Sequence, residues 1–299
     1  MSGVVVVGSV NLDDILRMDK LPGPGETVLA VGAGRALGGK GANQAVASAL
    51  AGAPTRFAGC VGDDAAGRFL RDQLSGYGVG VDDLRVVAEA GSGRALILIE
   101  DGGENSIVVE SGANHLVDAG AGVRLVEALP ADSVVLTQGE LLPVVIDAVA
   151  AACAARGLRF VLNLAPPAGV SAQTLAVADP LVVNEIEAAQ VGIDAAAFAA
   201  GESVAYPSRS LVVTLGRAGS ALSEAGGAVE TVASHAVPVV DTTGAGDAFV
   251  GTLVAGLARG DSMGGAARLA SAAAAFCVTR LGAAPSYGTP QEIAAGLDR

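Results

Sequence analysis

One short segment carries the residue types best suited to chemistry: Asp241-Thr242-Thr243-Gly244-Ala245-Gly246-Asp247, after which a long apolar helical pattern begins. Its glycines allow a tight turn and a close approach of backbone N–H groups to a ligand. The start of a helix attracts anions through free N–H groups and its dipole. Asp247, in the first turn, could accept a proton beside an anion held there. The structural alternative is a capped helix with an acidic residue where the dipole favours it.

This combination suits phosphoryl transfer to a hydroxyl group. That reaction needs a base for the alcohol proton, positive potential for the phosphoryl oxygens and a site without water. Asp247 can supply the base, and the N–H groups of Ala245, Gly246 and Asp247 can supply the potential.

Further polar residues follow predicted strands. Asn11 and Asp13 come just after a Val-rich strand expected at 3–8, and Glu140 follows a strand expected at 133–137. The carboxyl ends of strands in α/β sheets are where ligands bind, and carboxylates and amides can bridge neighbouring hydroxyls. Taken singly, each of these is an ordinary loop residue.

Strands alternate with helices along most of the chain, which predicts a doubly wound, mostly parallel α/β sheet flanked by helices. The predicted strands are 3–8, 57–61, 84–88, 133–137, 159–164, 181–183 and 211–215, an antiparallel pair at 220–223 and 228–232, and a β-rich run at 236–240. The predicted helices are 39–53, 64–74, 118–128, 143–156, 184–191, 246–259, 263–280 and 290–297. Short, partly polar strands at 14–19 and 27–31, with a hairpin formed by 94–100 and 106–110, predict a separate small β-sheet lid. The predicted large domain comprises 1–10, 38–89 and 112–299, and the lid comprises 11–37 and 90–111.

Composition excludes several classes of protein. The 299 residues are 51% hydrophobic with a formal net charge of −13, no Trp and 3% aromatics. Such a chain can bury a large core, but it repels nucleic acid and anionic membranes and lacks stacking platforms for single strands. No apolar run is long enough to span a bilayer, and the N-terminus does not resemble a signal peptide. Cys60, Cys153 and Cys277 are far apart in apolar contexts, which predicts reduced thiols and a cytoplasmic protein.

Other nucleotide and metal motifs fail. Gly34-Arg35-Ala36-Leu37-Gly38-Gly39-Lys40 approaches a P-loop, but Gly41 stands where that loop needs Ser or Thr for Mg²⁺. No Gly-x-Gly-x-x-Gly follows the first strand, so a nicotinamide-dependent dehydrogenase is disfavoured. His115 and His235 share no ligand spacing and are interpreted as ordinary polar residues.

The chain resembles the PfkB family of carbohydrate kinases and, within it, the ribokinases. Asp241–Asp247 resembles the family's C-terminal signature, and Gly38-Gly39-Lys40-Gly41-Ala42-Asn43-Gln44-Ala45 resembles its N-terminal signature. Segments around Asn11, Pro22, Asp63, Asn163, Asn184 and Pro285 match in the right order. The resemblance covers the whole chain and implies the same ribokinase-like fold that the alternation of elements predicts.

The resemblance assigns roles to the residues of the catalytic and sugar sites. It implies that Asp247 is the catalytic base and that Gly244, Ala245 and Gly246 form the anion hole. The implied sugar-binding residues are Asn11, Asp13, Gly39, Lys40, Asn43, Glu140 and Asp247.

A nucleotide site follows in the same way. Asn184 and Glu187 match an Asn-x-x-Glu motif expected near the ATP phosphates and their Mg²⁺. The same pair also fits a helix capping box, and both interpretations can hold. The remaining implied nucleotide-binding residues are Thr214, Gly216, Gly219, Gly246 and Ser271, the last at a position where some ribokinases have a His near the adenine.

An activating K⁺ is also implied. Its expected ligands, mostly backbone carbonyls, come from Asp241, Thr243, Cys277, Arg280, Gly282 and Ser286. An ion there would bias the geometry of the adjacent anion-hole loop.

Together these features predict an ATP-dependent kinase that transfers the γ-phosphoryl group to the 5-hydroxyl of D-ribose. The lid would close over the sugar and exclude water, and its edge strands would form a homodimer. One alternative is a PfkB kinase for another sugar or a nucleoside, and another is a non-catalytic sugar-binding protein. An intact base beside a phosphate-binding turn argues against the last.

Overall fold

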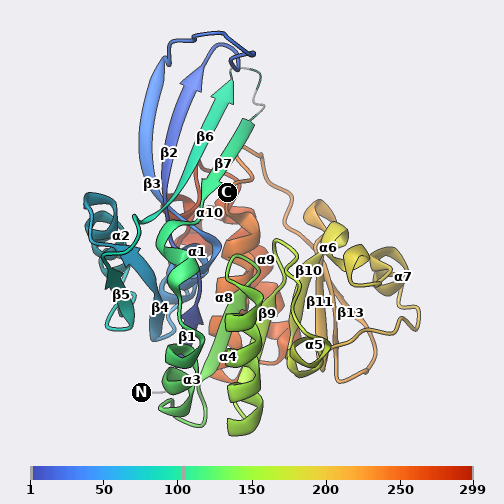
Figure 1. Ribbon diagram of the computed structural model, residues 1–299. Coiled ribbons are helices and arrows are strands. Elements are labelled where there is room, and N and C mark those ends of the chain that lie inside the picture. The colour runs from blue at the N-terminus through green and yellow to red at the C-terminus, as the bar shows by residue number, and fades with distance from the viewer. Residues whose placement is uncertain (1–2, 101, 103–104, 298–299) are drawn as a thin grey trace.

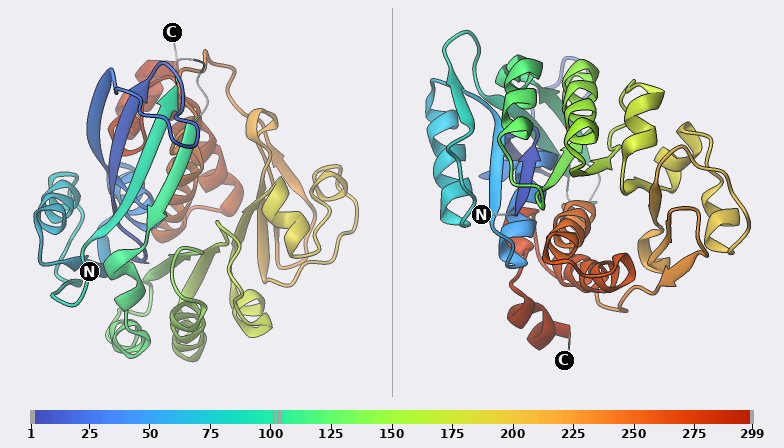
Figure 2. Two further views of the ribbon diagram at one scale, coloured as in Figure 1. Left: turned by 45° about the horizontal axis from the view of Figure 1, so that its top comes forward. Right: turned by 90° about the horizontal axis from the view of Figure 1, so that it is seen from below.

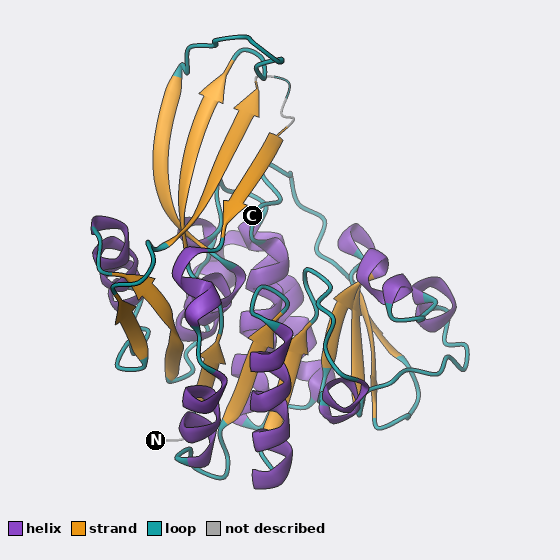
Figure 3. Ribbon diagram, viewed as in Figure 1, coloured by secondary structure: helices purple, strands orange, loops and turns teal. Residues whose placement is uncertain are grey.

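The computed structural model describes residues 3–100, 102 and 105–297. In these residues the chain forms a nine-stranded sheet and a separate four-stranded sheet (Figures 1 and 3). The large sheet has the strand order β13-β12-β11-β10-β9-β8-β1-β4-β5. Its strands are parallel from β5 through β11, and β12 and β13 join antiparallel at one edge. The predicted doubly wound α/β fold is therefore confirmed.

The strands of the large sheet are β1 (Val4–Val7), β4 (Thr55–Gly62), β5 (Leu84–Val87), β8 (Val134–Gln138), β9 (Arg159–Asn163), β10 (Leu181–Asn184), β11 (Ser210–Thr214), β12 (Ser220–Glu224) and β13 (Glu230–Val232). The α-helices are α1 (Lys40–Leu50), α2 (Ala65–Gly76), α3 (Ala119–Glu127), α4 (Pro143–Arg156), α5 (Ala172–Val177), α6 (Glu185–Gln190), α7 (Ala195–Ala199), α8 (Ala245–Arg259), α9 (Met263–Cys277) and α10 (Pro290–Leu297). Short 3₁₀ helices are η1 (Gly112–Leu116), η2 (Gly216–Ala218) and η3 (Ala284–Ser286).

The first strand shows why the sheet is covered on both faces. Val4 and Val6 pack in one apolar core with α1, α2, α8 and α9. Val5 and Val7 pack in the other core with α3, α4, α5, α6 and α7. Side chains alternate across a strand, so an unbroken run of valines suits a central strand buried on both faces. Seen from below, the helices lie on either side of the sheet (Figure 2).

The second sheet stands at one end of the molecule (Figure 1). Its order is β3 (Gly32–Gly38), β2 (Asn11–Met18), β6 (Gly93–Glu100) and β7 (Asn105–Glu110). β2 pairs antiparallel with β3 and parallel with β6, and β6 and β7 form the predicted hairpin. Most of the turn predicted at 101–104 lies outside the described residues.

Two predicted strands are wrong. Residues 27–31 form a loop, and the strand is β3, which begins at Gly32. The apolar side chains that suggested it, Leu29 and Val31, are 84% and 67% exposed. β3 is rich in Gly and Ala, which have low strand propensity. It is a strand because it pairs with β2, and residue propensity alone does not predict that pairing.

Residues 236–240 are also loop. Pro238 has no N–H for a ladder, and Val239 and Val240 are 64% and 58% exposed. The Val240 N–H donates to the Val278 carbonyl at 2.7 Å and so holds this segment against the turn after α9.

The helix predicted at 263–280 ends at Cys277, and its last predicted turn is a hydrogen-bonded turn. The short helices α5 and α7 were not predicted. Among the described residues, no helix has the length and apolar character required to cross a membrane.

Candidate active site

The candidate site lies at the carboxyl ends of the central strands. β1 lies between β8 and β4, so strand order reverses beside it, and this is where open α/β sheets bind ligands. Glu140, after β8, joins the neighbouring segments. Its Oε2 accepts hydrogen bonds from Ser9 Oγ at 2.5 Å and from the Lys40 N–H at 3.0 Å. Glu140 therefore holds the start of α1 against the loop after β1.

The start of α1 depends on glycine. Gly39 is the N-cap with φ of 85°, a left-handed conformation that other residues adopt at a cost. A Cβ on Gly41 would lie 2.7 Å from the Cα of Gly8. These glycines bring the backbone of α1 onto the end of β1, which places Lys40 and Asn43 at the same edge as Glu140.

Asp247 lies in the first turn of α8 and is only 8% exposed. Its Oδ2 accepts from Asn43 Nδ2 at 3.1 Å, and its Oδ1 accepts from Gln44 Nε2 at 2.8 Å. Burial raises the pKa of Asp247 above the usual value, while Lys40 and the two amides oppose that rise. A buried carboxylate with a raised pKa is a better proton acceptor than an exposed one.

Beside Asp247, the helix start presents unpaired backbone donors. Gly244 is the N-cap with φ of 78°, and Tyr287 Oη donates to its carbonyl at 3.1 Å. The N–H groups of Gly246 and Asp247 have no hydrogen-bond partner within the described part of the chain. A Cβ added to Gly246 would meet no atom within 4 Å. The segment therefore offers free donors with open space beside Gly246, as an anion hole requires.

The small sheet contributes Asn11 and Asp13. Burial raises the pKa of Asp13 to about 7, and the charges of Glu140, Asp14 and Asp247 add to this. A Cβ on Gly38 would lie 1.9 Å from Asp13 Oδ1, so glycine at this position makes room for the carboxylate. The structure thus brings Asp13 close enough to Glu140 and Asp247 for their charges to interact.

Two site amides differ in how fully they are paired. Asn11 is buried, and its Oδ1 accepts from Asn114 Nδ2 at 2.8 Å. The buried Oδ1 of Asn43 has no hydrogen-bond partner among the described residues. A buried acceptor without a partner is costly, and a hydroxyl donor from a ligand would satisfy it.

The predicted nucleotide residues lie on neighbouring strands. Asn184 and Thr214 are paired across β10 and β11. Asn184 and Glu187 form the capping box: Asn184 Oδ1 accepts from the Glu187 N–H, and Glu187 Oε2 accepts from the Asn184 N–H, both at 2.8 Å. Burial raises the pKa of Glu187, while the hydrogen bond from the Asn184 N–H and the charge of Lys40 lower it, so Glu187 is near enough to Lys40 for their charges to interact. The structural interpretation of this motif is confirmed and leaves room for the functional one.

Gly216 begins η2 after β11 and Gly219 follows it, and both have positive φ. A Cβ on Gly219 would lie 2.0 Å from the Val232 carbonyl oxygen, so this glycine allows the loop to return beside β13. Ser271, in α9, is buried and donates to the Ala233 carbonyl at 2.9 Å.

The residues expected around K⁺ converge beside the anion-hole segment. Asp241 accepts from the Thr243 N–H and the Gly282 N–H, each at 2.9 Å. Cys277 Sγ lies 3.5 Å from the Thr243 carbonyl oxygen and 3.0 Å from Ser286 Oγ. Arg280 is on the same turn, and its guanidinium carbon lies 3.5 Å above the Phe276 ring. One carboxylate, a hydroxyl and backbone carbonyls form an oxygen-rich set that fits a hard monovalent cation.

Several residues of the site were not predicted. Gln44, Gln138 and Asn163 form hydrogen bonds beneath Asp247, and Ser9 and Asn114 hold Glu140 and Asn11. Gln44 lies inside the recognised N-terminal signature, but its role depends on a partner 203 residues away. The one feature of the sequence that could have pointed to such residues is a polar side chain at the end of a buried strand.

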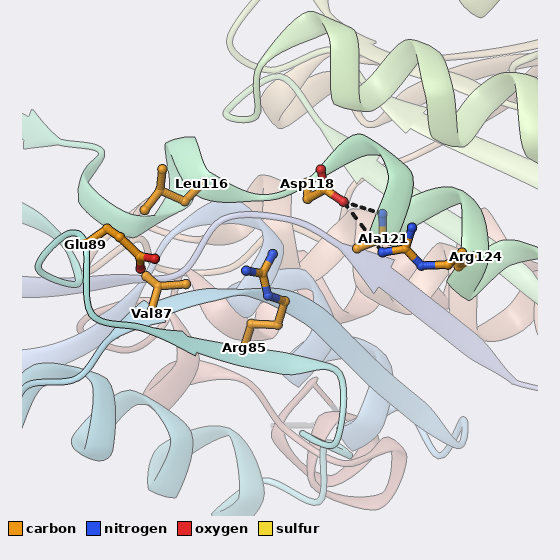
Figure 4. A pocket seen from close by; sticks show the side chains of 7 residues that line it. All are labelled: Arg85, Val87, Glu89, Leu116, Asp118, Ala121 and Arg124. Carbon is orange, nitrogen blue, oxygen red and sulfur yellow. Dashed lines mark hydrogen bonds and ion pairs between the residues drawn. The ribbon is translucent and has the colours of Figure 1, made fainter.

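Two surface hollows of the described structure lie elsewhere. One, of about 430 Å³, lies between β5 and the start of α3 and is lined by Arg85, Val87, Glu89, Leu116, Asp118, Ala121 and Arg124 (Figure 4). Asp118 caps α3 through the Ala121 N–H and pairs with Arg124 at 3.7 Å. The other hollow adjoins it and shares Arg85, Asp118 and Ala121. Neither is lined by a predicted site residue.

The fold and site define an α/β phosphotransferase, and comparison with known proteins agrees. Residues 1–290 match the model of the pfkB family of carbohydrate kinases. The chain belongs to this family. It is 35% identical over 293 residues to the ribokinase of Bacillus subtilis, covering 98% of each protein.

Solved structures agree on the fold. The structure of the Arabidopsis thaliana ribokinase complexed with ribose and ATP superimposes with a TM-score of 0.84, at 30% identity and complete coverage of both chains. A nucleoside kinase of Burkholderia thailandensis in complex with inosine has a TM-score of 0.80 at 22% identity, covering 99% of this chain and 96% of that one. The second likeness concerns the fold alone, so substrate choice rests on the site residues and the closer relatives.

Proposed function

We propose that this protein is an ATP-dependent ribokinase that transfers the γ-phosphoryl group of ATP to the 5-hydroxyl of D-ribose, giving ribose 5-phosphate and ADP. The observation that carries this proposal is the buried carboxylate of Asp247 beside the unpaired N–H groups at the start of α8. The full-length likeness to ribokinases supports ribose as the acceptor.

Asp247 accepts the proton of the ribose hydroxyl as that oxygen attacks the γ-phosphorus. The turn of Gly244, Ala245 and Gly246 presents the free N–H groups of Gly246 and Asp247, which stabilise the charge on the transferred group, whereas the Ala245 N–H already donates to the Thr242 carbonyl. Lys40, whose pKa is raised chiefly by the charge of Asp247, stays protonated and adds positive potential. The base and the anion hole lie in one helical turn, so one segment serves both needs.

The sugar is held by Asn11, Asp13, Gly39, Lys40, Asn43 and Glu140. Support comes from the unpaired buried Oδ1 of Asn43 and from the cluster of carboxylates around Asp13. Carboxylates and amides can bridge neighbouring hydroxyls. ATP binds at the ends of β10 and β11 in this proposal, with its phosphates near Asn184, Glu187, Thr214, Gly216 and Gly219 and its adenine toward Ser271.

The segments 11–37 and 90–111 form the lid, and the rest of the chain forms the large domain. The separate second sheet supports this division. Exposed apolar residues on β6 and β7, including Leu96, Ile107, Val108 and Val109, support pairing of two lids in a homodimer.

Mg²⁺ would be held mainly by the ATP phosphates, with Glu187 and Asn184 nearby. The described residues contain no group of three or more His, Cys, Asp or Glu side chains able to hold a metal, and this suits an ion bound largely through its nucleotide. K⁺ would be held by the residues Asp241, Thr243, Cys277, Arg280, Gly282 and Ser286, where it would support the adjacent anion-hole segment.

The cysteines support the cytoplasm as the compartment, because Cys60, Cys153 and Cys277 are buried and form no disulfide.

ADP production with Mg-ATP tests the proposal. The acceptors are ribose, fructose, 2-deoxyribose, adenosine and pseudouridine, each with potassium or with only a bulky organic cation. Ribose-dependent turnover that rises with potassium is expected. Turnover on another acceptor alone would keep the role of Asp247 and overturn the sugar assignment. Ribose binding without ADP release would favour a sugar-binding protein instead.

A further inference from the structure

We propose that Gln44 is a positioning residue for the catalytic carboxylate: its side-chain amide holds Asp247 in the orientation that faces the sugar. The inference rests on the proposed kinase function. Gln44 itself is fully buried and lies behind Asp247, so it acts through that residue and not on the substrate.

The contacts form a branched, directed chain of hydrogen bonds. Gln138 Nε2 donates to Gln44 Oε1 at 2.8 Å. Gln44 Nε2 donates to Asp247 Oδ1 at 2.8 Å and to Asn163 Oδ1 at 2.9 Å. Asn163 Nδ2 then donates to the Val182 carbonyl at 3.1 Å. The chain thus anchors the carboxylate to the ends of β8 and β9 and to the backbone of β10.

The orientation of the Gln44 amide follows from its neighbours. Both protons of its nitrogen are used on oxygen acceptors, and its oxygen faces the amide nitrogen of Gln138. A flipped amide would place Oε1 against the oxygens of Asp247 and Asn163, which offer no proton when Asp247 is ionised. Because all the donors point the same way, each bond polarises the next and strengthens the donation to Asp247.

The network also favours the ionised form of the buried Asp247 carboxylate, because hydrogen bonds from Gln44 and Asn43 oppose the rise in pKa that burial causes. The titratable groups whose charges act on Asp247, or on which it acts, are Lys40, Glu140, Asp13, Glu187, Cys277 and Tyr287. Lys40 is the cation among them, and the carboxylates oppose ionisation. Gln44 and Asn43 are the side chains that donate hydrogen bonds to Asp247 in the described structure. Without the Gln44 donor, the carboxylate would lose both an anchor and a stabiliser of its ionised form.

Gln44→Met tests this, because Met is similar in size and donates no hydrogen bond. We expect kcat to fall by about 10- to 100-fold, the loss typical of a hydrogen bond to a charged group. The acid limb of the kcat profile should move upward by about one pH unit, while the ribose Kd changes by less than about threefold. Ser48→Ala is the matched control: Ser48 is equally buried on the same helix, accepts a hydrogen bond from Thr55 Oγ1 and forms none with Asp247 in the described structure. It should leave the pH profile unchanged.

Gln44→Glu is a second test of the positioning role. It keeps an acceptor for Gln138 but places a carboxyl beside Asp247, so its acid limb should lie at still higher pH. Folded Gln44 variants with wild-type kcat and pH profile would overturn the proposal. Failure of both variants to fold would also overturn it, since the residue would then be structural. An inactive wild-type protein would instead refute the kinase function, so the two failures are distinguishable.

Discussion

Asn43 Nδ2 lies 3.1 Å from Asp247 Oδ2, although 204 residues separate the two in the chain. The close packing of α1 against α8 makes this possible, since a Cβ on Gly251 would lie 2.4 Å from the Gln44 carbonyl oxygen. The N-terminal signature, which we expect to bind the sugar, and the C-terminal signature, which carries the proposed base, therefore form one unit. A sugar hydroxyl that donates to Asn43 Oδ1 would hold the sugar beside Asp247, the proposed base.

Asp247→Asn tests the base. The amide is the same size but accepts a proton poorly, so turnover should fall by about 10²- to 10⁴-fold while ribose affinity stays close to wild type. Steady-state ADP release and calorimetric ribose binding measure the two quantities. Asp194→Asn is the control, because Asp194 caps α7 and is not one of the predicted site residues. Near-normal turnover of Asp247→Asn would remove the base assignment.

Asp13 should make ribose binding depend on pH. Its pKa is raised from 3.8 to about 7, so near neutrality a small change in pH alters its charge. A carboxylate accepts hydrogen bonds from hydroxyls better than a carboxylic acid does, so the ribose Kd should decrease as pH rises through about 7. Asp13→Asn should bind ribose about 10- to 100-fold more weakly, and its Kd should lose this dependence. Equal pH dependence in both proteins would assign the titration to another group.

The same residue should influence stability. Between pH 3.8 and about 7, folded Asp13 holds a proton that the unfolded chain releases. Stability therefore falls as pH rises through this window. Thermal unfolding of Asp13→Asn should show a shallower fall than the wild type over the same range, since the neutral amide has no charge to bury.

Features of the fold that depend on a local sequence pattern could be predicted, and features that depend on a distant partner could not. Buried strands such as β1 are continuous apolar runs, and they were predicted almost to the residue. β3 was misplaced because its Gly- and Ala-rich strand is defined by pairing with β2. The segment 236–240 looked like a strand, although it pairs with no strand among the residues that the structure describes. Local pattern cannot supply a partner that comes from elsewhere in the chain.

The same limit applies to the site. Asp247 and the residues around Gly39 could be proposed from short motifs, because a glycine turn and a helix start are local. Gln44 and Gln138 could not, since their role is a hydrogen bond between side chains 94 residues apart. The electrostatics of Asp13 likewise depend on Glu140 and Asp247, which only the folded sheet brings near.

Gly38→Ala should disturb the sugar site through Asp13. The added Cβ would lie 1.9 Å from Asp13 Oδ1, so the carboxylate must move. We expect the KM for ribose to rise by about tenfold or more, with little change in the KM for ATP. Gly34→Ala is a matched control on the same strand, where an added Cβ meets no atom within 4 Å. If both variants behave alike, the position of Asp13 does not govern ribose binding.

Gly246→Ala should separate stability from activity. Gly246 lies in the first turn of α8, and its φ is not positive. Its Cβ would meet no atom of the described protein within 4 Å. Alanine should therefore stabilise the helix by up to about 1 kcal/mol. The methyl group would, however, occupy the space through which a phosphoryl oxygen reaches the backbone donors, so kcat should fall by about 10²-fold or more.

Gly244→Ala supplies the contrast. Gly244 has φ of 78°, and its Cβ would lie 2.7 Å from Ala283 and Tyr287 atoms, so this variant should lose stability as well as activity. Thermal unfolding and ADP release on the two variants measure both effects. A Gly246→Ala protein that is stabilised and fully active would show that no ligand oxygen approaches this turn, and the anion hole would then have to be sought elsewhere. Lost activity in a stabilised protein would place the transferred phosphoryl group beside Gly246, within reach of Asp247.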